Sequence, residues 1–464
     1  MANLPEATDR EETGVGSYFV ANYPPFSVWT NEATDQARDA LSSPPSVVPL
    51  GLYLHIPFCR KRCHFCYFRV YTNKNARDVE NYLDLLTAEW EMYAEAPAIA
   101  ARPLHFVYFG GGTPSFLSTA QLERLVTGLT TKGDWSQAAE ITFECEPGTL
   151  SETKLAALRD FGVTRLSLGV ENFDDRILEI NGRAHRSPEI SKVYHHAREL
   201  RFPQINIDLI AGMMGETDEN WRACIERTIA LSPDSVTIYQ MELPYNTTIS
   251  NTLLNANTSS APGVEKPRGA SQPRGFRLHA EDAASVASWP QKRRWVMDAF
   301  DALERAGYHI GSAYTAVKNP ETTKFVYRDR LWEGADLAGL GVASFGHVNG
   351  VHMQNLDTWE AYSESITAGR LPLSRAYTPN TEERFIREFI LQLKRGAVVP
   401  AYFTQKYGID PLQRFPGEIA SIAQEGFLAE RSPERITLTR EGLLRVDTLL
   451  HRFFLPAHRG IRYT

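Results

Sequence analysis

Cysteine is scarce in this sequence, which has five cysteines in 464 residues. That number is far too small for a disulfide-stabilised scaffold. No apolar run approaches the length needed to span a bilayer, and the first residues, MANLPEATDREETG, lack the apolar segment of a signal peptide. We therefore expect a cytoplasmic location and no membrane partner, and in that compartment thiols stay reduced.

Positive charge is also in short supply. The formal net charge is −7 at pH 7, so nothing in the balance of charges predicts a nucleic-acid-binding surface. Hydrophobic residues make up 43% of the chain and charged residues 23%, and both values are ordinary for a globular protein. The length allows two domains, or one large α/β domain with an appendage.

Three of the few cysteines lie close together, in the segment CRKRCHFC. Cys59, Cys63 and Cys66 have the spacing C-x3-C-x2-C, and clustered reduced thiols indicate metal binding or catalysis. Three thiolates on one loop can hold three irons of a [4Fe–4S] cluster and leave the fourth iron open for substrate chemistry. A structural zinc ion would need four ligands, commonly in separated C-x2-C pairs. Cys145 is a conceivable fourth cluster ligand, and a chance grouping of cysteines is the remaining alternative.

Strand-like and helix-like segments alternate between residues 51 and 243. This alternation predicts an α/β fold with parallel strands in right-handed βαβ units. The predicted strands cover 51–58, 104–112, 140–147, 165–172, 204–212 and 235–243. The predicted helices cover 78–95, 118–129 with Ser118 as N-cap, 151–162, 174–181, 187–201 and 219–231. The functional groups follow the strands' carboxyl ends, where both barrels and open α/β sheets build active sites, and periodicity cannot distinguish these two.

Composition divides the chain into five regions. Residues 1–46 form an N-terminal arm, partly disordered, whose aromatic stretch YFVANYPPFSVW is expected to pack on another part of the chain. Residues 47–250 form the α/β core, and residues 251–289, rich in Gly, Pro, Ser and Asn, read as a flexible insertion. Residues 290–379 extend the core and include the strand-like, glycine-rich LAGLGVASFGHVNG. Residues 380–464 predict a helical, winged-helix-like cap that ends in the strand ITLT and a final helix.

The segment LYLHIPFCRKRCHFCYF resembles the radical S-adenosylmethionine (SAM) superfamily. More narrowly, HIPFC-x3-C-x2-C is similar to the oxygen-independent coproporphyrinogen III oxidase group and its relative, the heme chaperone. FGGGTPS, ECEPGTL, RLSLGVENF, NGRAH and INIDLIAG follow in the family's order, so the resemblance covers nearly all of the chain from about residue 50. It implies a partial (β/α)6 TIM-like barrel with a C-terminal cap, a [4Fe–4S] cluster, SAM, a small-molecule substrate, and an external electron donor such as flavodoxin or ferredoxin.

The resemblance also implies the chemistry and the residues that serve it. The open iron would bind the amino and carboxylate groups of SAM, and one electron would then release a 5′-deoxyadenosyl radical that abstracts hydrogen. The implied metal ligands are Cys59, Cys63 and Cys66. The positions that match family contacts to SAM are Tyr53, Phe65, Gly110, Gly111, Gly112, Thr113, Glu144, Glu171, Arg183 and Asp208.

The chemical character of these residues suits the implied contacts. Glycines let a backbone approach a ligand closely, and a carboxylate at Glu144 suits the SAM ammonium. Glu146 is expected on the opposite side of the strand or beyond its end. Glu171 stands where the family usually has glutamine, and both can accept hydrogen bonds from ribose. An acid inside an apolar strand, Asp208, is less readily explained as a solvated residue.

The sequence departs from both named members of the group. The oxidase has a further cysteine after the third ligand, where this chain has Phe68, and the heme chaperone has a His-Asn pair that is absent from KFVYRDRLWEG. The aromatic arm resembles that of the oxidase. We therefore predict an oxidase-like radical SAM enzyme that decarboxylates a porphyrinogen. The alternatives are a C-methyltransferase or cyclopropanase that holds two SAM molecules, with Phe345 near the second, and a heme chaperone-like or other non-catalytic binding protein.

Overall fold

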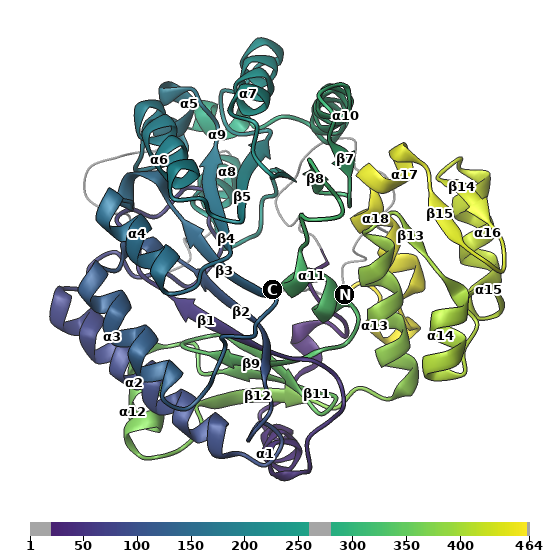
Figure 1. Ribbon diagram of the computed structural model, residues 1–464. Coiled ribbons are helices and arrows are strands. Elements are labelled where there is room, and N and C mark those ends of the chain that lie inside the picture. Colours follow the sequence, from purple (N-terminus) through teal and green to yellow (C-terminus); the bar gives the residue numbers. More distant parts are fainter. Residues whose placement is uncertain (1–19, 259–279, 462–464) are drawn as a thin grey trace.

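The computed structural model describes residues 20–258 and 280–461. Six strands alternate with helices in chain order and form the centre of a mixed sheet (Figure 1). The strands are β1 (Leu50–Ile56), β2 (Leu104–Gly111), β3 (Glu140–Cys145), β4 (Arg165–Glu171), β5 (Gln204–Ala211) and β6 (Ser235–Gln240). The helices between them are α2 (Ala76–Glu95), α3 (Thr119–Thr130), α4 (Glu152–Asp160), α5 (Asp175–Ile180), α6 (Ser187–Glu199) and α7 (Asp218–Leu231). Every strand and helix predicted for this region is present within a few residues.

The sheet continues beyond both ends of this parallel core. Next to β1 lie β9 (Asp336–Leu340), β10 (Phe345–Val348), β11 (Val351–Asn355) and β12 (Leu373–Tyr377), and next to β6 lie β8 (Thr315–Val317) and β7 (His309–Ile310). β9 pairs in parallel with β1, and the other added strands are antiparallel. Among the described strands, β12 and β7 are the two outer edges of one twelve-stranded sheet. The sheet is therefore open, and the predicted partial barrel is confirmed.

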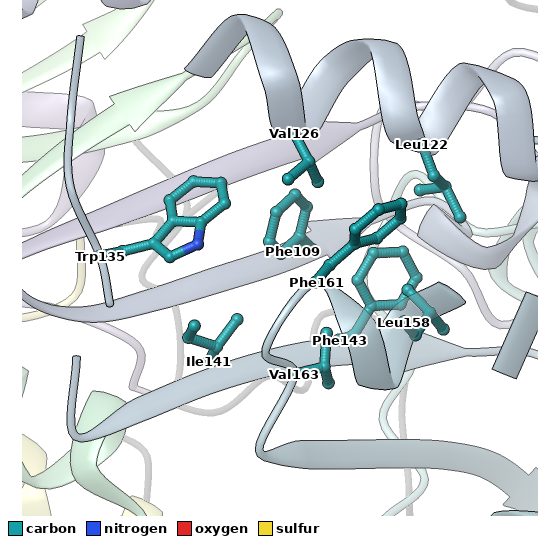
Figure 2. Close-up of a pocket in the computed structure, with 9 residues that line it drawn as sticks. All are labelled: Phe109, Leu122, Val126, Trp135, Ile141, Phe143, Leu158, Phe161 and Val163. Carbon is teal, nitrogen blue, oxygen red and sulfur yellow. The ribbon is translucent and has the colours of Figure 1, made fainter. Parts of the chain in front are cut away.

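The two faces of the core strands differ in polarity. In β3, Ile141 and Phe143 face the helices, whereas Thr142 and Glu144 alternate with them on the other face. Figure 2 shows the helix side, where apolar residues of α3, α4 and the strands β2 and β3 meet around a void. The void holds about 10 Å³, room for no more than about one water molecule, so it is a feature of core packing. The polar face is left to form the site.

Local sequence explains several helix ends. The predicted N-cap is confirmed: the Ser118 hydroxyl accepts a hydrogen bond from the Gln121 N–H at 3.2 Å, and the Gln121 side chain returns one from the Ser118 N–H. This reciprocal arrangement satisfies two N–H groups that the first turn leaves free. Helix α2 begins with the same arrangement at Asn75 and Asp78, slightly earlier than predicted.

The described part of the N-terminal arm packs on two other regions, as expected. Val20 and Tyr23 are buried in the apolar core of the C-terminal region, and the Trp29 ring stacks on His352 of β11 with 5.1 Å between ring centroids. The sequence did not predict helix α1 (Thr34–Ser42), which packs against β12 and β11. The predicted disorder at residues 1–17 lies outside the described residues.

The described residues between β6 and the C-terminal region form five helices. They are α8 (Thr248–Thr258), α9 (Ala280–Ala284), α10 (Trp289–Arg305), α11 (Val326–Trp332) and α12 (Trp359–Thr367). The described ends of the predicted insertion, residues 251–258 and 280–289, thus include helices α8 and α9, which its composition did not predict. The remainder of that insertion lies outside the described residues.

The C-terminal region forms a separate lobe beside the sheet, coloured yellow-green in Figure 1. Its helices are α13 (Thr381–Leu393), α14 (Pro400–Tyr407), α15 (Pro411–Arg414), α16 (Pro416–Gln424), α17 (Arg440–Leu444) and α18 (Val446–Leu450). Its sheet has the order β13 (Ala397–Val398), β15 (Ile436–Leu438) and β14 (Leu428–Arg431). Helices followed by a hairpin give the predicted winged-helix-like cap, whose core contains a cluster of phenylalanines around Phe389. No helix in the described part of the chain is long and apolar enough to cross a membrane.

Candidate active site

The cysteine loop follows β1 and is held at its base and near its middle. At the base, the Cys59 N–H donates to the Tyr71 carbonyl at 3.1 Å, and the Tyr71 N–H donates to the Pro57 carbonyl at 2.7 Å. Further along, the His64 N–H donates to the Asn181 carbonyl after α5 at 3.0 Å. A loop without regular structure is therefore ordered by distant backbone groups.

All three clustered cysteines line one cavity at the carboxyl ends of the strands. The Thr113 hydroxyl donates to Cys59 Sγ at 3.3 Å, and Arg183 Nη1 donates to Cys63 Sγ at 3.3 Å. Burial raises the pKa of Cys59 to about 11 and that of Cys66 to about 12. Donors of this kind stabilise bound thiolates, and a metal would deprotonate the buried thiols on binding. The loop thus fits a thiolate-ligated cluster.

The spacing of the thiols bears on which metal centre they suit. Within residues 20–258 and 280–461, no three Cys, His, Asp or Glu side chains lie close enough together to bind a single metal ion. A [4Fe–4S] cluster places each thiolate on a different iron, so its ligands stand further apart than those of one zinc ion. Cys145 packs among apolar core residues and its Sγ donates to the Phe143 carbonyl, so it does not join the other three.

The glycines after β2 leave space beside the cysteine loop. A Cβ atom on Gly112 would lie 2.9 Å from the Pro57 carbonyl carbon and 3.0 Å from Cys59 Sγ. Gly111 has a φ of +115°, a conformation that favours glycine. A larger residue at Gly112 would collide with the cysteine loop, and one at Gly111 would meet the His55 ring, 2.7 Å from its Nδ1.

Three carboxylates from adjacent strands face the same cavity: Glu144 of β3, Glu171 at the end of β4, and Asp208 of β5. Burial, together with repulsion from the neighbouring carboxylates, raises the pKa of Glu144 and of Glu171 to about 7. Burial also raises the pKa of Asp208. Glu144 accepts hydrogen bonds from the Tyr108 hydroxyl at 2.7 Å and from the Gly111 N–H at 3.2 Å. A cation in this cavity would relieve the repulsion.

Arg183 lies between the carboxylates and the thiols. Its Nη2 donates to the Gly169 carbonyl at 2.6 Å and stands 3.7 Å from Glu171 Oε1. Its Nε is buried without a hydrogen-bond partner among the described residues. Glu171 has a φ of +63°, an uncommon conformation for a residue with a side chain and one often found at functional sites. Asp208 is oriented by the Ser167 hydroxyl, which donates at 2.8 Å.

Aromatic side chains complete the wall. Tyr53 of β1 stacks on Tyr108 with ring centroids 5.9 Å apart, and its hydroxyl is 3.2 Å from His55 Nδ1. Phe65 lines the cavity and packs against apolar clusters that include Met213. Every site residue predicted from the sequence lines this cavity except Gly110, which lies behind the rings of Tyr53 and Tyr108.

One expectation needs correction, and one residue was missed. Glu146 also lines the cavity and accepts from His185 Nδ1 at 3.1 Å. It lies just beyond β3, which ends at Cys145, so the expected position beyond the strand's end is confirmed and the one on the opposite side is wrong. Residues two apart in a strand share a face, which the spacing from Glu144 should have indicated. Arg165 likewise faces the cavity, and its place two residues before Ser167 in the alternation of β4 was the available signal.

Two phenylalanines noted in the sequence also lie at the cavity. Phe68 is 45% exposed, which is unusual for so large an apolar side chain. Phe345 lines the wall as well, but its ring stacks on Phe26 of the arm with 4.3 Å between centroids. One face of Phe345 is therefore covered by the chain itself.

The comparison with known families agrees with this site. Residues 53–228 match the family model described as the Radical SAM superfamily. Residues 53–228 therefore carry a Radical SAM domain, which supports an enzyme, and that family implies a [4Fe–4S] cluster and SAM.

Relatives with particular names match most of the chain. The chain is 27% identical over 394 residues to heme chaperone HemW of Bacillus subtilis (strain 168), covering 84% of this chain and 96% of the relative. It is 27% identical over 422 residues to oxygen-independent coproporphyrinogen III oxidase of Salmonella typhimurium (strain LT2), covering 86% and 84%. The solved structure of coproporphyrinogen III oxidase from Escherichia coli has a TM-score of 0.76 and 23% identity, covering 94% of this chain and 96% of that one, so the two share a fold.

Proposed function

We propose that this protein cleaves SAM reductively at a [4Fe–4S] cluster held by Cys59, Cys63 and Cys66, and that it oxidatively decarboxylates a porphyrinogen. The observation that carries the proposal is the meeting of three thiols and three carboxylates on one cavity. SAM carries positive charge at its amino group and at its sulfur. Such a ligand relieves the repulsion that raises the carboxylate pKa values.

Each residue at the cavity has a definite task in this proposal. Glu144 accepts a charge-assisted hydrogen bond from the amino group of SAM, and Asp208 accepts from its ribose hydroxyls. Arg183 offsets the charge of the SAM carboxylate and already donates to Cys63 Sγ. Gly112 leaves room for the methionine end of SAM. When bound, the cluster and SAM supply an organic radical that removes a hydrogen atom from the substrate.

The size of the cavity supports a substrate larger than SAM alone. Its volume is about 2740 Å³, whereas a pocket for one small ligand holds roughly 300–1,000 Å³. Loss of one hydrogen atom, one electron and carbon dioxide from a propionate side chain leaves a vinyl group. The electron for SAM cleavage comes from an external donor such as flavodoxin or ferredoxin, and the electron lost by the substrate passes to an external acceptor.

The alternatives receive less support from the described residues. Methyl or methylene transfer would need a second SAM beside Phe345, but Phe26 covers one face of that ring. Heme capture of the chaperone kind lacks its His-Asn pair in this chain. The arm that packs on the C-terminal lobe favours an oxidase-like enzyme, because the sequence resembles the oxidase in that segment.

One anaerobic incubation tests the proposal. Cluster-reconstituted protein, SAM, a strong reductant and coproporphyrinogen III are combined, and mass spectrometry identifies the products. We expect 5′-deoxyadenosine together with loss of carbon dioxide from the tetrapyrrole. The matched control is Cys63→Ala, which should give neither product.

Other products would redirect the assignment. 5′-Deoxyadenosine with an unchanged tetrapyrrole would contradict the substrate and retain the radical chemistry. A methylated acceptor would favour the transferase. Cluster-loaded protein that produces no 5′-deoxyadenosine would contradict SAM cleavage itself.

A further inference from the structure

Arg165 is a buried arginine on the cavity face of the sheet. It is the first residue of β4, its side chain shares a face with Ser167 and Glu171, and it lines the cavity. Only 6% of its surface is exposed. It begins the strand that Glu171 ends, which separates their backbones by about 20 Å. Arg165 therefore lies far from the cysteine loop, in the deep part of the cavity.

The guanidinium of Arg165 has no anion in direct contact among the described residues. Within the described residues it makes no hydrogen bond and no ion pair, and its Nε is buried without a hydrogen-bond partner. It stacks on the ring of Phe325, whose centroid lies 4.1 Å from the Arg165 Cζ. A stacked ring compensates a buried cation far less than a hydrogen-bonded carboxylate does.

Carboxylates elsewhere on this side of the molecule are already engaged. Asp329 stands 2.8 Å from Arg328 Nη2. Glu140 accepts the N–H groups of Val326 and Tyr327 at the start of α11, at 2.8 and 3.1 Å. Neither lies within ion-pair distance of Arg165. The charge of Arg165 lowers the pKa of Glu144 and of Asp208, but among the described residues no carboxylate forms an ion pair or a hydrogen bond with its guanidinium.

A second guanidinium, ion-paired with Asp329, lies beside the same ring. The Arg328 Cζ lies 4.6 Å from the centroid of the same Phe325 ring, and its Nη1 donates to the hydroxyls of Thr315 and Ser312 at 3.0 and 3.3 Å. Burial lowers the pKa of Arg328, and the charge of Arg165 lowers it further. Two cations beside one aromatic ring, with a single carboxylate paired to Arg328, are an arrangement that favours a bound anion.

We propose that Arg165 and Arg328 form a subsite that binds one carboxylate group of the substrate. Arginine presents a planar fork of donors that matches a carboxylate, and the free Nε and Nη groups of Arg165 face such a ligand without rearranging other contacts. The proposal rests on the porphyrinogen function proposed above, because that substrate carries several propionate groups. Since the subsite is far from the cysteine loop, it anchors a carboxylate other than the reacting one.

The test measures binding of coproporphyrin III, the stable fluorescent form of the porphyrinogen, to the full-length protein. Loss of a charge-assisted hydrogen bond in Arg165→Gln should raise the Kd by about 10- to 100-fold. Arg165→Lys keeps the charge and should recover part of that loss. The matched control is Arg227→Gln, because Arg227 lies 4.8 Å from the Phe173 ring outside the cavity and should leave the Kd unchanged.

A change in the ligand tests the same subsite without altering the protein. The tetramethyl ester of coproporphyrin III has no carboxylate, so it should bind weakly, and equally, to wild type and Arg165→Gln. Circular dichroism and thermal unfolding verify that each variant is folded. Displacement of coproporphyrin III by inorganic phosphate more readily than by propionate would overturn the assignment to a carboxylate.

The outcomes separate this proposal from the one on which it rests. An unchanged Kd in folded Arg165→Gln would overturn the subsite alone. A weakened Kd without decarboxylated product from wild type would retain the subsite and overturn the reaction. A wild-type protein that does not bind coproporphyrin III would overturn both.

Discussion

A buried glutamate in the C-terminal lobe and a half-buried glutamate in the core are treated in opposite ways. Glu388 of α13 is 3% exposed, and Lys406 Nζ donates to it at 2.8 Å, as do the hydroxyls of Tyr402 and Tyr407 at 2.6 Å. Glu144 of β3 has two neutral donors, and no cation among the described residues lies within ion-pair distance of it. The lobe thus neutralises its buried charge internally, whereas the core leaves its charge to a ligand.

This difference shows which part of the molecule is stabilised by its own ion pairs and which part is arranged for ligand binding. A buried carboxylate paired with a lysine and two hydroxyls fixes the packing of α13 against α14. A buried carboxylate without a cation is costly to the folded chain and becomes favourable only when a cation arrives. The lobe is therefore a packing module, and the polar face of the sheet is prepared for ligands.

Removing a thiol should have the largest effect on the ligand-binding side of this comparison. Cys63→Ala leaves two cluster ligands on the loop, so we expect complete loss of the [4Fe–4S] cluster, seen as loss of bound iron and of visible absorbance. Cys224→Ala is the matched control, because Cys224 is equally a free thiol but is buried in α7 away from the cavity. A Cys63→Ala protein with full iron content would contradict the ligand assignment.

Removing the cation in the lobe should lower the free energy of unfolding. Lys406→Met leaves Glu388 buried without its cation, and we expect the free energy of unfolding to fall by about 2 kcal/mol, reduced from the full value for a buried pair because Lys406 is 32% exposed. Urea unfolding followed by circular dichroism measures this. In the control, Lys132→Met, both members of the Lys132–Glu95 pair are well exposed, and the loss should be below about 1 kcal/mol. Equal losses of unfolding free energy in both variants would refute the distinction between the buried pair and the exposed pair.

Removing the unpaired charge of Glu144 in the core should raise the free energy of unfolding rather than lower it. The folded-state pKa of Glu144, about 7, lies above the ordinary 4.5. The folded state therefore keeps its proton longer, and stability falls as pH rises through that interval. Glu144→Gln has no carboxyl group to deprotonate and so avoids this loss. We therefore expect its free energy of unfolding, relative to that of wild type, to be up to about 3 kcal/mol higher above pH 7 than below pH 4.5.

The measurement for this variant is urea unfolding from pH 4.5 to 8, with wild type in parallel, and SAM binding on the same samples. We expect SAM affinity to fall by about tenfold or more as stability rises. If the free energies of unfolding of wild type and Glu144→Gln changed with pH in parallel, the charge of Glu144 would not destabilise the folded state.

The smallest effect is expected at the cysteine that lies close to the site in sequence but packs in the core. Cys145→Ala should leave the iron content unchanged, because this side chain faces the apolar core. The free energy of unfolding should fall by about 1 kcal/mol through the lost packing. Loss of iron in this variant would restore Cys145 as a candidate fourth ligand.

Local sequence patterns were sufficient to predict much of the fold. The strand predicted at 104–112 is β2 (Leu104–Gly111), and the helix predicted at 187–201 is α6 (Ser187–Glu199). Hydrophobic period, glycine stops and caps act within a few residues, so a single chain reveals them. Helix α1 was missed because its stability comes from packing on β11 and β12, which lie more than 300 residues away.

The sequence by itself determined the cysteine spacing, the strand–helix alternation and the motifs that follow each strand, because each depends on neighbours along the chain. Only the tertiary structure decided which buried charges are paired. Glu388 meets Lys406 across two helices, whereas neither Arg165 nor Glu144 lies within ion-pair distance of an opposite charge in the part of the chain that the structure describes. Charge pairing acts through space over a few ångströms, and the register of distant elements sets those distances.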